Sequence, residues 1–405
     1  MPRLEVWLYG TKVGELTGTS WRDFDFIAAP EGLARFGVLS TVLSEAIPFT
    51  VRPVPGRAAR RRNFFEELLP EDLTRIRLAE QAGVEAGDTL GLLRRYGRDV
   101  AGAVEVFDPA DPWEPPTPEL RPLDSGQVRG LAESFPTVPL GNDPLRGRLS
   151  LGGVQLKLAL VRHNGHWWQP LGGYPSTHIL KQSPERYPTM IFDEEYGCRL
   201  ATQFGLMEYD VHIESFDDLP MLVIERYDRF LQDGTIQRLH QEDMNQALGA
   251  SGNQKYQQHG GVVTLQRIAR LVAAKGAEER DRLLRMVVFA AAIGNLDLHA
   301  KNISLLHFPD STVRLAPSYD NVPLLCQPTD GELALAVNRV YRLSDLSVTD
   351  LAQEARSWGM ADQSSRIDDW LTVISSLVDS TDPLPGAAPD LPRIISANIV
   401  RLRSR

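Results

Sequence analysis

The stretch Asn-Leu-Asp-Leu-His-Ala-Lys-Asn, residues 295–302, decides the fold prediction for this chain. Within it, Asp297, His299 and Asn302 form the pattern D-x-H-x-x-N. The spacing from Asp297 to Asn302 is that of kinase catalytic loops, where the aspartate accepts the proton of the substrate hydroxyl and the asparagine holds a magnesium ion. A second aspartate, Asp320, follows in Pro-Ser-Tyr-Asp. Together these residues predict ATP-dependent phosphoryl transfer.

The residues around the loop predict how Asp320 reaches it. Residues 283–293 are mostly apolar and predict a buried helix that ends at Gly294. Residues 303–316 predict two short strands joined by a turn. Such a hairpin brings Asp320 beside Asn302, so that two oxygen ligands converge, as a magnesium ion requires. The alternative, a polar helix end followed by a surface hairpin, is disfavoured by the placement of Asp320.

The residues before the loop follow the order of a kinase N-lobe. Gly152 and Gly153 would let backbone N–H groups approach phosphates. Lys181 ends a predicted strand at the position of the phosphate-pairing lysine, and Glu195, early in a predicted helix, would pair with it. A predicted hairpin then leads into a hinge at residues 225–227. Each feature alone has a structural explanation as a turn or a solvated charge, so their order carries the kinase prediction. The predicted elements are strands at residues 156–161, 166–169 and 177–181, a helix at residues 192–204, and a hairpin at residues 211–225.

Longer segments extend the pattern along most of the chain. They are residues 6–8, 13–16, 63–70 (Asn-Phe-Phe-Glu-Glu-Leu-Leu-Pro), 97–103 (Gly-Arg-Asp-Val-Ala-Gly-Ala), 150–157, 178–181, 225–229 (Glu-Arg-Tyr-Asp-Arg), 239–244 (Leu-His-Gln-Glu-Asp-Met) and 294–304. In these segments the chain resembles the HipA toxin kinases of bacterial toxin–antitoxin modules. The last segment is the most specific match, because it joins D-x-H-x-x-N to Lys301 and a following strand.

The resemblance implies a site for ATP and Mg²⁺. It implies that Asp297 is the catalytic base, that Lys181 reaches the ATP phosphates, and that Asn302 and Asp320 hold magnesium. Ser150 matches the serine that the family autophosphorylates, and a phosphate there would add about two negative charges to the loop that cradles ATP, switching the enzyme off. The residues expected to bind ATP are Gly152, Gly153, Val154, Gln155, Lys157, Lys181, Glu225, Arg226, Tyr227, His299, Lys301, Asn302, Tyr319 and Asp320.

The resemblance also implies partners. Known members phosphorylate aminoacyl-tRNA synthetases, which arrests translation and growth, and they bind a helix-turn-helix antitoxin of the HipB type that represses the shared operon. The best-described relatives carry a basic patch that touches operator DNA. In this chain the comparable region, residues 334–346, offers only Arg339 and Arg342. We therefore expect contact with DNA only through the antitoxin.

Two other functions stay open from the residues alone. One is a small-molecule kinase of the aminoglycoside-phosphotransferase type, which also uses D-x-H-x-x-N; the N-terminal segment and Ser150 argue against it. The other is an inactive kinase-like partner in a repressor complex. The intact residues Lys181, Asp297, Asn302 and Asp320 argue against that function.

Composition agrees with an enzyme of two or three domains. The chain has 405 residues, a hydrophobic content of 42% and a formal net charge of −10, which argues against a nucleic-acid-binding protein. A basic run at residues 57–62 is interpreted as a solvated loop, with a contact to an antitoxin or acidic substrate as the alternative. Cys198 and Cys326 form no metal-binding or disulfide pattern and fit a reducing cytoplasm. We find no signal-peptide pattern and no membrane span, and we expect a cytoplasmic protein.

We expect an α+β fold with a bilobed protein-kinase-like core, consisting of a β-rich N-lobe and a helical C-lobe, after a small α+β N-terminal subdomain. Six prolines between residues 108 and 122 predict a semi-rigid linker. The expected boundaries are residues 1–107 for the N-terminal subdomain, 108–122 for the linker, 123–233 for the N-lobe and 234–405 for the C-lobe.

Overall fold

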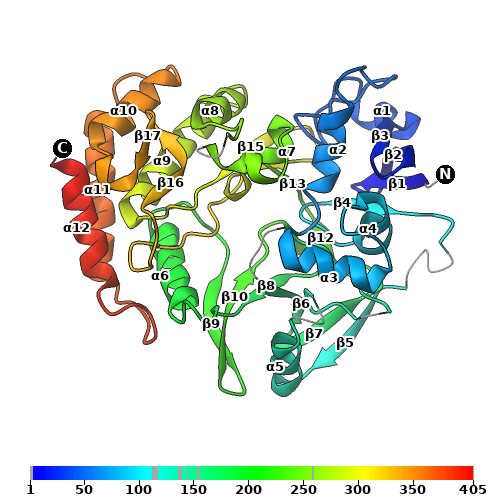
Figure 1. The fold of residues 1–405 in the computed structure, drawn as a ribbon, viewed down its shortest axis with the longest axis horizontal. Helices are drawn as coiled ribbons and strands as arrows, with labels where there is room; N and C mark the ends of the chain where they lie inside the picture. The colour runs from blue at the N-terminus through cyan, green and yellow to red at the C-terminus, as the bar shows by residue number, and fades with distance from the viewer. Residues whose placement is uncertain are drawn as a thin grey trace. The chain divides into compact units, whose positions relative to one another are not determined.

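The structure is a computed structural model that describes residues 3–111, 117–135, 139–143, 145–152, 156–257 and 260–404. The chain divides into two compact units. Unit 1 comprises Met1–Gln182, Glu214–Gly252 and Leu306–Thr312, and unit 2 comprises Ser183–Ile213, Asn253–Leu305 and Val313–Arg405. Strands dominate unit 1 and helices dominate unit 2 (Figure 1). The mixed α+β composition that the sequence predicts is confirmed.

Unit 1 begins with an antiparallel sheet of four strands in the order β3-β2-β1-β4. In β1 the side chains of Leu4, Val6 and Leu8 are buried while their neighbours are more exposed, which is the alternation that one buried sheet face requires. The strands are β1 (Arg3–Leu8), β2 (Thr11–Ser20), β3 (Asp23–Ala28) and β4 (Val104–Phe107); the helices between β3 and β4 are α1 (Pro30–Phe36), α2 (Ala58–Glu66), α3 (Asp72–Ala82) and α4 (Thr89–Tyr96).

A sheet of six strands follows, in the order β5-β7-β6-β8-β10-β9. Its strands are β5 (Glu119–Leu123), β6 (Lys157–His163), β7 (His166–Leu171), β8 (His178–Lys181), β9 (Val211–Phe216) and β10 (Leu219–Glu225). Part of the expected linker is therefore a strand, because residues 119–122 lie in β5. Pro122 is tolerated there since β5 is an edge strand, where a missing N–H breaks no second ladder.

One hydrophobic cluster of unit 1 joins its first sheet to residues between 140 and 159, and a second cluster, which includes Leu158, Leu160 and Leu180, packs the six-stranded sheet. Leu140, Leu149, Leu151 and Ala159, from the second part of the unit, belong to the same buried cluster as Phe64 and other residues of the first part. The expected boundary at residue 107 thus separates two segments of the sequence within one compact unit. The remaining elements of unit 1 are α5 (Ser125–Glu133), β11 (Arg229–Gln232), β12 (Thr235–Arg238), β13 (His240–Asp243) and α7 (Met244–Leu248).

Unit 2 is built mainly from helices. It contains α6 (Met190–Gln203), α8 (Leu265–Ala273), α9 (Ala277–Ile293), the short 3-10 helices η3 (Ala300–Asn302) and η4 (Leu343–Asp345), β15 (Val313–Leu315), β16 (Glu332–Val337), β17 (Val340–Arg342), α10 (Val348–Ser357), α11 (Ser364–Ser380) and α12 (Leu391–Arg403). Three elements cross the sequence boundaries between the units, namely β9, the 3-10 helix η1 (Gly252–Lys255) and β14 (Ser304–His307).

Helix α6 groups with unit 2, although the sequence placed it within the N-lobe. The Tyr196 hydroxyl donates to the carbonyl oxygen of Val378 in α11 at 3.4 Å. The Asp193 carboxylate accepts from the backbone N–H of Ala388 at 2.8 Å, before α12. These long-range contacts hold α6 to the helical unit, and local sequence patterns do not predict them.

Apolar spacing explains the helices of unit 2. Helix α8 starts at the N-cap Thr264, and its buried residues Leu265, Ile268, Ala269 and Val272 follow the spacing of one helical face. Helix α9 is buried almost continuously from Leu283 to its end. Among the helices of the described residues, none combines the length and apolar character needed to cross a bilayer.

A buried histidine in β13 couples the stability of unit 1 to pH. The Nε2 atom of His240 lies 2.7 Å from the Leu43 carbonyl oxygen, and the Ala103 backbone N–H points at Nδ1 with an N···N distance of 3.4 Å. Burial, together with the neighbouring His307, lowers the pKa of His240 to about 3. The unfolded chain therefore binds a proton at His240 in a pH range where the folded chain does not.

We expect the free energy of unfolding to fall as the pH drops from about 6.5, by up to about 1.4 kcal/mol per pH unit from this group. Above the ordinary histidine pKa the neutral form dominates in both states, so His240 has no effect there. Urea unfolding of wild type and His240→Gln between about pH 6.5 and 5 measures the slope, and the variant should show a shallower one. Exposed His163→Gln is the control. Equal slopes for wild type and His240→Gln would contradict the assignment.

Candidate functional site

The end of helix α9 sets the start of the D-x-H-x-x-N loop. Gly294 has a φ of +74°, and a Cβ added there would lie 2.2 Å from Cγ of Leu325, so only glycine fits. The Leu324 backbone N–H also donates to the Gly294 carbonyl at 3.0 Å. The predicted helix end at Gly294 is confirmed, and the contact with Leu325 adds a packing reason that the sequence does not reveal.

A buried amide, Asn295, joins the loop to the segment of Asp320. Its Nδ2 donates to the Asp320 carbonyl oxygen at 2.9 Å, and its Oδ1 accepts from the Asp297 backbone N–H at 3.0 Å. Asn295 is 2% exposed, and Asp320 adopts a φ of +51°. Asn295 therefore ties the backbone of Asp320 to the start of the loop, while the convergence of the Asp320 and Asn302 oxygens on one ion stays a prediction.

Asp297 presents its carboxylate to solvent. Its side chain is 49% exposed, and Oδ1 lies 3.9 Å from Nε2 of His299, too far for a hydrogen bond. The Asn302 Nδ2 donates to the Asp297 carbonyl oxygen at 2.8 Å. This bond fixes the position of Asn302, the predicted metal ligand, relative to Asp297, the predicted base. Because the amide nitrogen makes the bond, it also sets the orientation of the Asn302 side chain.

His299 is held in the loop as a neutral side chain. Burial, with a smaller contribution from Lys255, lowers its pKa to about 4 even though Asp320 opposes the shift. The ring meets Tyr256 edge to face at 5.2 Å between centroids. Its Nδ1 is buried with no hydrogen-bond partner among the residues that the structure describes. These contacts show His299 packed within the loop, and its predicted part in ATP binding stays a prediction.

Tyr319 ties the end of the loop to the strand that follows it. Its hydroxyl donates to the Lys301 carbonyl oxygen at 2.6 Å and lies 2.6 Å from Oγ of Ser304. The Ala316 backbone N–H donates to the Ser304 carbonyl at 2.8 Å, as the predicted hairpin requires. The hydroxyl of Tyr319 is thus used to hold the loop, and Ser304 is a supporting residue that sequence reasoning missed.

The donor chemistry of Asn302 and Asp320 suits magnesium. An amide oxygen and a carboxylate are the hard ligands that this ion prefers, and kinases leave its other positions to water and phosphate oxygens. Within the described ranges there is no group of three or more His, Cys, Asp or Glu residues arranged to hold a metal.

Unit 1 places two predicted phosphate-binding lysines on neighbouring strands. Lys157 in β6 is directly opposite Lys181 in β8 in an antiparallel register, so both side chains point to the same face. Lys181 is 6% exposed, and Nζ of Lys157 donates to the Gly152 carbonyl at 2.6 Å. Like charges placed opposite each other repel, and an anionic ligand relieves that repulsion. The predicted residues Gly153, Val154 and Gln155 lie outside the described residues.

Ser150 is completely buried beside the N-terminal part of unit 1. Its backbone N–H donates to the Asp99 carbonyl at 2.9 Å, and its hydroxyl donates to the Leu68 carbonyl at 3.1 Å. A kinase cannot reach this hydroxyl in the present position. Phosphorylation of Ser150 would therefore require the segment to leave its place first.

The hinge residues differ in how the protein uses them. The Arg226 backbone N–H donates to the Thr177 carbonyl at 2.9 Å, and its carbonyl accepts from Arg229 at 3.1 Å. Arg226 is 4% exposed, whereas Glu225 is at the surface. The Tyr227 hydroxyl donates to the side chain of Gln241. Arg226 thus supports the predicted hinge from within.

Glu195 has a partner on its own helix. Its Oε1 lies 2.6 Å from Nε of Arg199, one turn further along α6. Burial raises the pKa of Glu195 in spite of this pairing. The pairing of Glu195 with Lys181 stays a prediction.

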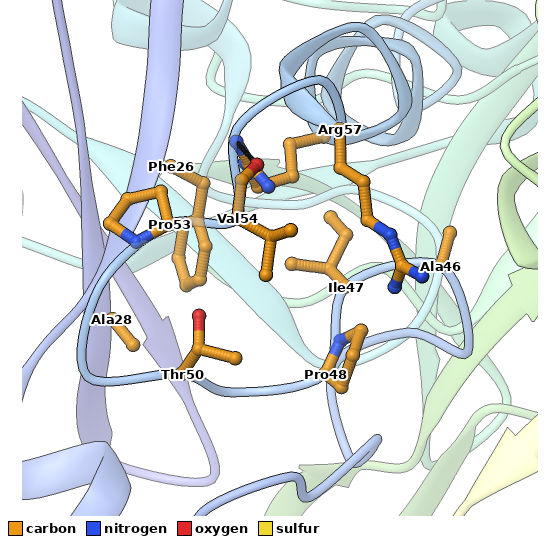
Figure 2. A pocket seen from close by; sticks show the side chains of 10 residues that line it. Phe26, Ala28, Ala46, Ile47, Pro48, Thr50, Pro53, Val54 and Arg57 are labelled. Carbon is orange, nitrogen blue, oxygen red and sulfur yellow. Dashed lines mark hydrogen bonds between the residues drawn. The ribbon is translucent and has the colours of Figure 1, made fainter.

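The interpretation of residues 57–62 as a loop is wrong, because most of the basic run lies in helix α2. Arg61 is 7% exposed and binds both carboxylate oxygens of Asp25, at 2.5 and 2.8 Å. Figure 2 shows the small pocket beside it, which Phe26, Ile47 and Val54 line together with Arg57. Arg61 therefore stabilises the first sheet, and this pocket lies apart from the predicted nucleotide-binding segments of unit 1.

The brace at Asn295 leads to a test of the loop. In Asn295→Ala the Asp320 carbonyl and the Asp297 N–H lose their buried partner, so the free energy of unfolding should fall by about 1–3 kcal/mol. Because a small displacement of reacting groups is costly, the rate of phosphate transfer from ATP should fall by roughly 100-fold. Radiolabelled ATP and urea unfolding measure the two effects.

The matched control is Asn398→Ala. The Asn398 amide donates to the Ala291 and Ala292 carbonyls in α9, each at 2.8 Å, and the residue is 7% exposed. This variant should lose similar stability with little loss of rate. If both variants slow the reaction equally, general softening of unit 2 explains the effect and the brace does not.

Comparisons with known proteins agree across the chain. Residues 4–107 match the HipA N-terminal domain, and residues 149–379 match the HipA-like C-terminal domain. The "Putative kinase Y4mE" of Sinorhizobium fredii is 33% identical over 93% of this chain and 90% of its own length. The "Serine/threonine-protein kinase toxin HipA" of Shewanella oneidensis is 31% identical over 71% of this chain and 69% of its own length.

A solved structure agrees as well. The Shewanella oneidensis HipA, determined in complex with HipB and operator DNA, matches this chain with a TM-score of 0.80 and 27% identity, covering 99% of this chain and 96% of that one. This match confirms the expected kinase-like fold. Together with the domain that spans residues 149–379, it shows that the chain belongs to the HipA family of serine/threonine-protein kinase toxins.

Proposed function

We propose that this kinase uses ATP and magnesium to phosphorylate a serine or threonine of a protein substrate. The observation that carries the proposal is the cross-strand pair Lys157 and Lys181, which puts two cations on one face of the sheet. The braced loop of unit 2 supports it, because Asp297 keeps an exposed carboxylate there. The resemblance implies that residues 225–227 bind the adenine through backbone groups. The Arg226 N–H already donates to the Thr177 carbonyl, so we assign this role to Glu225 and Tyr227.

In the proposed reaction Asp297 accepts the proton of the substrate hydroxyl while the hydroxyl oxygen forms a bond to the γ-phosphorus of ATP. The bond between that phosphorus and the bridging oxygen breaks, and ADP leaves with the electron pair. Lys181 and Lys157 would neutralise the phosphate oxygens, and Asn302 and Asp320 would hold the metal. Bound magnesium supplies positive charge to the phosphates. Catalysis of this kind rests on alignment and charge stabilisation.

We propose that Ser150 is the site of self-inactivation. Ser150 is buried, and its hydroxyl is bonded to the Leu68 carbonyl, which supports a switch with two positions. A phosphate on Ser150 would carry roughly two negative charges, and the buried space that now holds a hydroxyl could not accommodate them. The phosphorylated Ser150 segment would stay outside its buried position. The adjoining Gly152 would then no longer be available to bind the phosphates of ATP.

The proposed protein substrate is an aminoacyl-tRNA synthetase, and the proposed partner is an antitoxin of the HipB type. The structural relative that was solved with HipB and operator DNA supports the second proposal. Contact with DNA would run through the antitoxin. Arg342, one of only two cations at residues 334–346, already lies 3.6 Å from Glu332, which supports the expectation that this region makes no direct contact.

The first experiment is incubation with magnesium and ATP, followed by mass spectrometry. We expect phosphate on Ser150 of wild type and none in the variants Asp297→Asn and Asp320→Asn. Asp297→Asn removes the proposed catalytic base, which costs roughly 100- to 10,000-fold in rate, and Asp320→Asn removes the charge of a proposed magnesium ligand. Addition of a chelator should abolish the reaction. Unmodified wild-type protein that binds ATP but transfers no phosphate, either to itself or to tRNA synthetases, would contradict the proposal.

The lysine pair yields a separate prediction for nucleotide affinity. Lys157→Gln and Lys181→Gln should each weaken ATP binding by about 1.5–3 kcal/mol, since each removes a charged hydrogen-bond donor. Titration calorimetry with ATP and magnesium measures the change. Lys12→Gln is the control, because Lys12 pairs with Glu5 at 2.7 Å in the first sheet of unit 1. An unchanged affinity in both lysine variants would exclude the pair as a phosphate site.

A further inference from the structure

Unit 1 buries four charged side chains together, outside the groups proposed to act in catalysis. They are Asp99, Arg226, Asp228 and Arg229, and none is more than 6% exposed. Two carboxylates face two guanidinium groups, so the cluster is neutral as a whole. We call this set the buried charge cluster.

Direct ion pairs connect the members of the buried charge cluster. Arg226 binds Asp228 through two hydrogen bonds, from Nε to Oδ1 at 2.9 Å and from Nη2 to Oδ2 at 2.8 Å. Arg229 binds both acids, with Nη2 2.9 Å from Oδ1 of Asp99 and Nη1 3.0 Å from Oδ2 of Asp228. Arg229 therefore links the two carboxylates into one network.

The cluster also holds the backbone of segments that lead to the proposed nucleotide-binding residues. Asp99 Oδ2 accepts from the Ser176 N–H at 2.9 Å, just before strand β8, which ends at Lys181. The Asp99 carbonyl accepts from the Ser150 N–H at 2.9 Å, just before Gly152. Arg226 itself lies in the hinge, and its Nη1 donates to the Ser176 hydroxyl at 2.8 Å.

The other side of the cluster is the backbone of residues 100–102. The Val100 carbonyl accepts from Nη2 of Arg226 at 3.0 Å and from Nη2 of Arg229 at 2.9 Å. The Gly102 N–H donates to Asp228 at 2.7 Å, and its carbonyl accepts from Arg229 at 2.8 Å. Gly102 has a φ of +78°, and an added Cβ would lie 2.6 Å from the Gln241 nitrogen. This loop therefore fits only with glycine at residue 102.

We propose that the buried charge cluster is a positioning device through which the N-terminal segment, residues 99–102, sets the arrangement of the Ser150 segment, the Lys181 strand and the hinge for nucleotide binding. The inference rests on the proposed function, because it takes Gly152, Lys181 and residues 225–227 as nucleotide-binding. It goes beyond that function by giving the N-terminal segment a part in ATP affinity.

Electrostatics gives the physical reason. A charge taken out of water is stable only when its partners are in place with good geometry. The four members cannot adopt intermediate spacings without leaving a charge unpaired in a low-dielectric interior. The segments that carry them are therefore held in one relative arrangement, which is what a site for a polyvalent anion needs.

The test replaces Asp99 with asparagine, which keeps the shape and removes the charge. We expect the half-saturating ATP concentration for Ser150 phosphorylation to rise roughly 10- to 100-fold, because the phosphate-binding groups are displaced. The maximal rate is not used as a readout, because Asp99 also holds the Ser150 segment that accepts the phosphate. Calorimetric titration with ADP and magnesium should show the same loss of affinity.

The matched control is Asp25→Asn, which breaks another aspartate–arginine pair of unit 1, that between Asp25 and Arg61. It should lower the thermal midpoint without changing the half-saturating ATP concentration. If Asp99→Asn does not fold, Ser176→Ala can be tested in its place, because it leaves all four charges of the cluster intact. It removes the hydroxyl that accepts from Arg226 and should raise the same concentration by a smaller factor.

The outcomes separate the two proposals. Wild type that neither binds ADP nor transfers phosphate contradicts the proposed function. Active wild type whose ATP dependence equals that of Asp99→Asn and Ser176→Ala contradicts the positioning role. A rise in half-saturating ATP that Asp25→Asn shares equally also contradicts it, because loss of stability then explains the effect.

Discussion

Complete pairing of buried charges is the constraint on which unit 1 depends. Asp99, Arg226, Asp228 and Arg229 lie almost entirely out of water, and removal of one partner from such a pair typically costs about 3–5 kcal/mol. The pairs form only when residues 99–102, Ser176 and residues 226–229 arrive together. The hydrophobic cluster that contains Phe64 together with Leu149, Leu151 and Ala159 brings these distant segments within reach. The N-terminal part and the kinase-like sheet are therefore one compact unit in energetic terms.

The loop of unit 2 is held by a different kind of interaction. Neutral groups brace it: the Asn295 amide, the Tyr319 hydroxyl and a His299 ring whose pKa is lowered to about 4 by burial, with Lys255 adding to the shift. In the proposed mechanism, these neutral braces would leave the charge of Asp297 to act on a proton and that of Asp320 to act on a cation. Fixed dipoles that need no rearrangement during the reaction are an effective source of catalysis. Buried ion pairs thus hold segments of unit 1 together, whereas neutral side chains hold the loop of unit 2.

Local signals in the sequence predicted most elements of the kinase-like part. The helix that ends at Gly294, the hairpin after Asn302 and the strand that ends at Lys181 follow from apolar spacing and turn residues, and the structure confirms them.

Other predictions missed long-range packing. Residues 57–62 were read as a loop because of their charge, yet Arg61 is buried against Asp25 and helix α2 runs through most of the stretch. Helix α6 groups with unit 2 through contacts with residues near Val378 and Ala388.

The sequence by itself determined the order of the motifs, the family and the residue types that could serve phosphoryl transfer, because these depend on spacing along the chain. Tertiary structure alone decided which residues support them. The pairing of Lys157 with Lys181 depends on strand register, and the bond from Asn295 to Asp320 depends on how the chain returns to the loop. The burial of Ser150 and the buried charge cluster depend on segments that meet only in the folded core. Spacing is a property of the chain, whereas pairing and desolvation exist only after distant residues have come into contact.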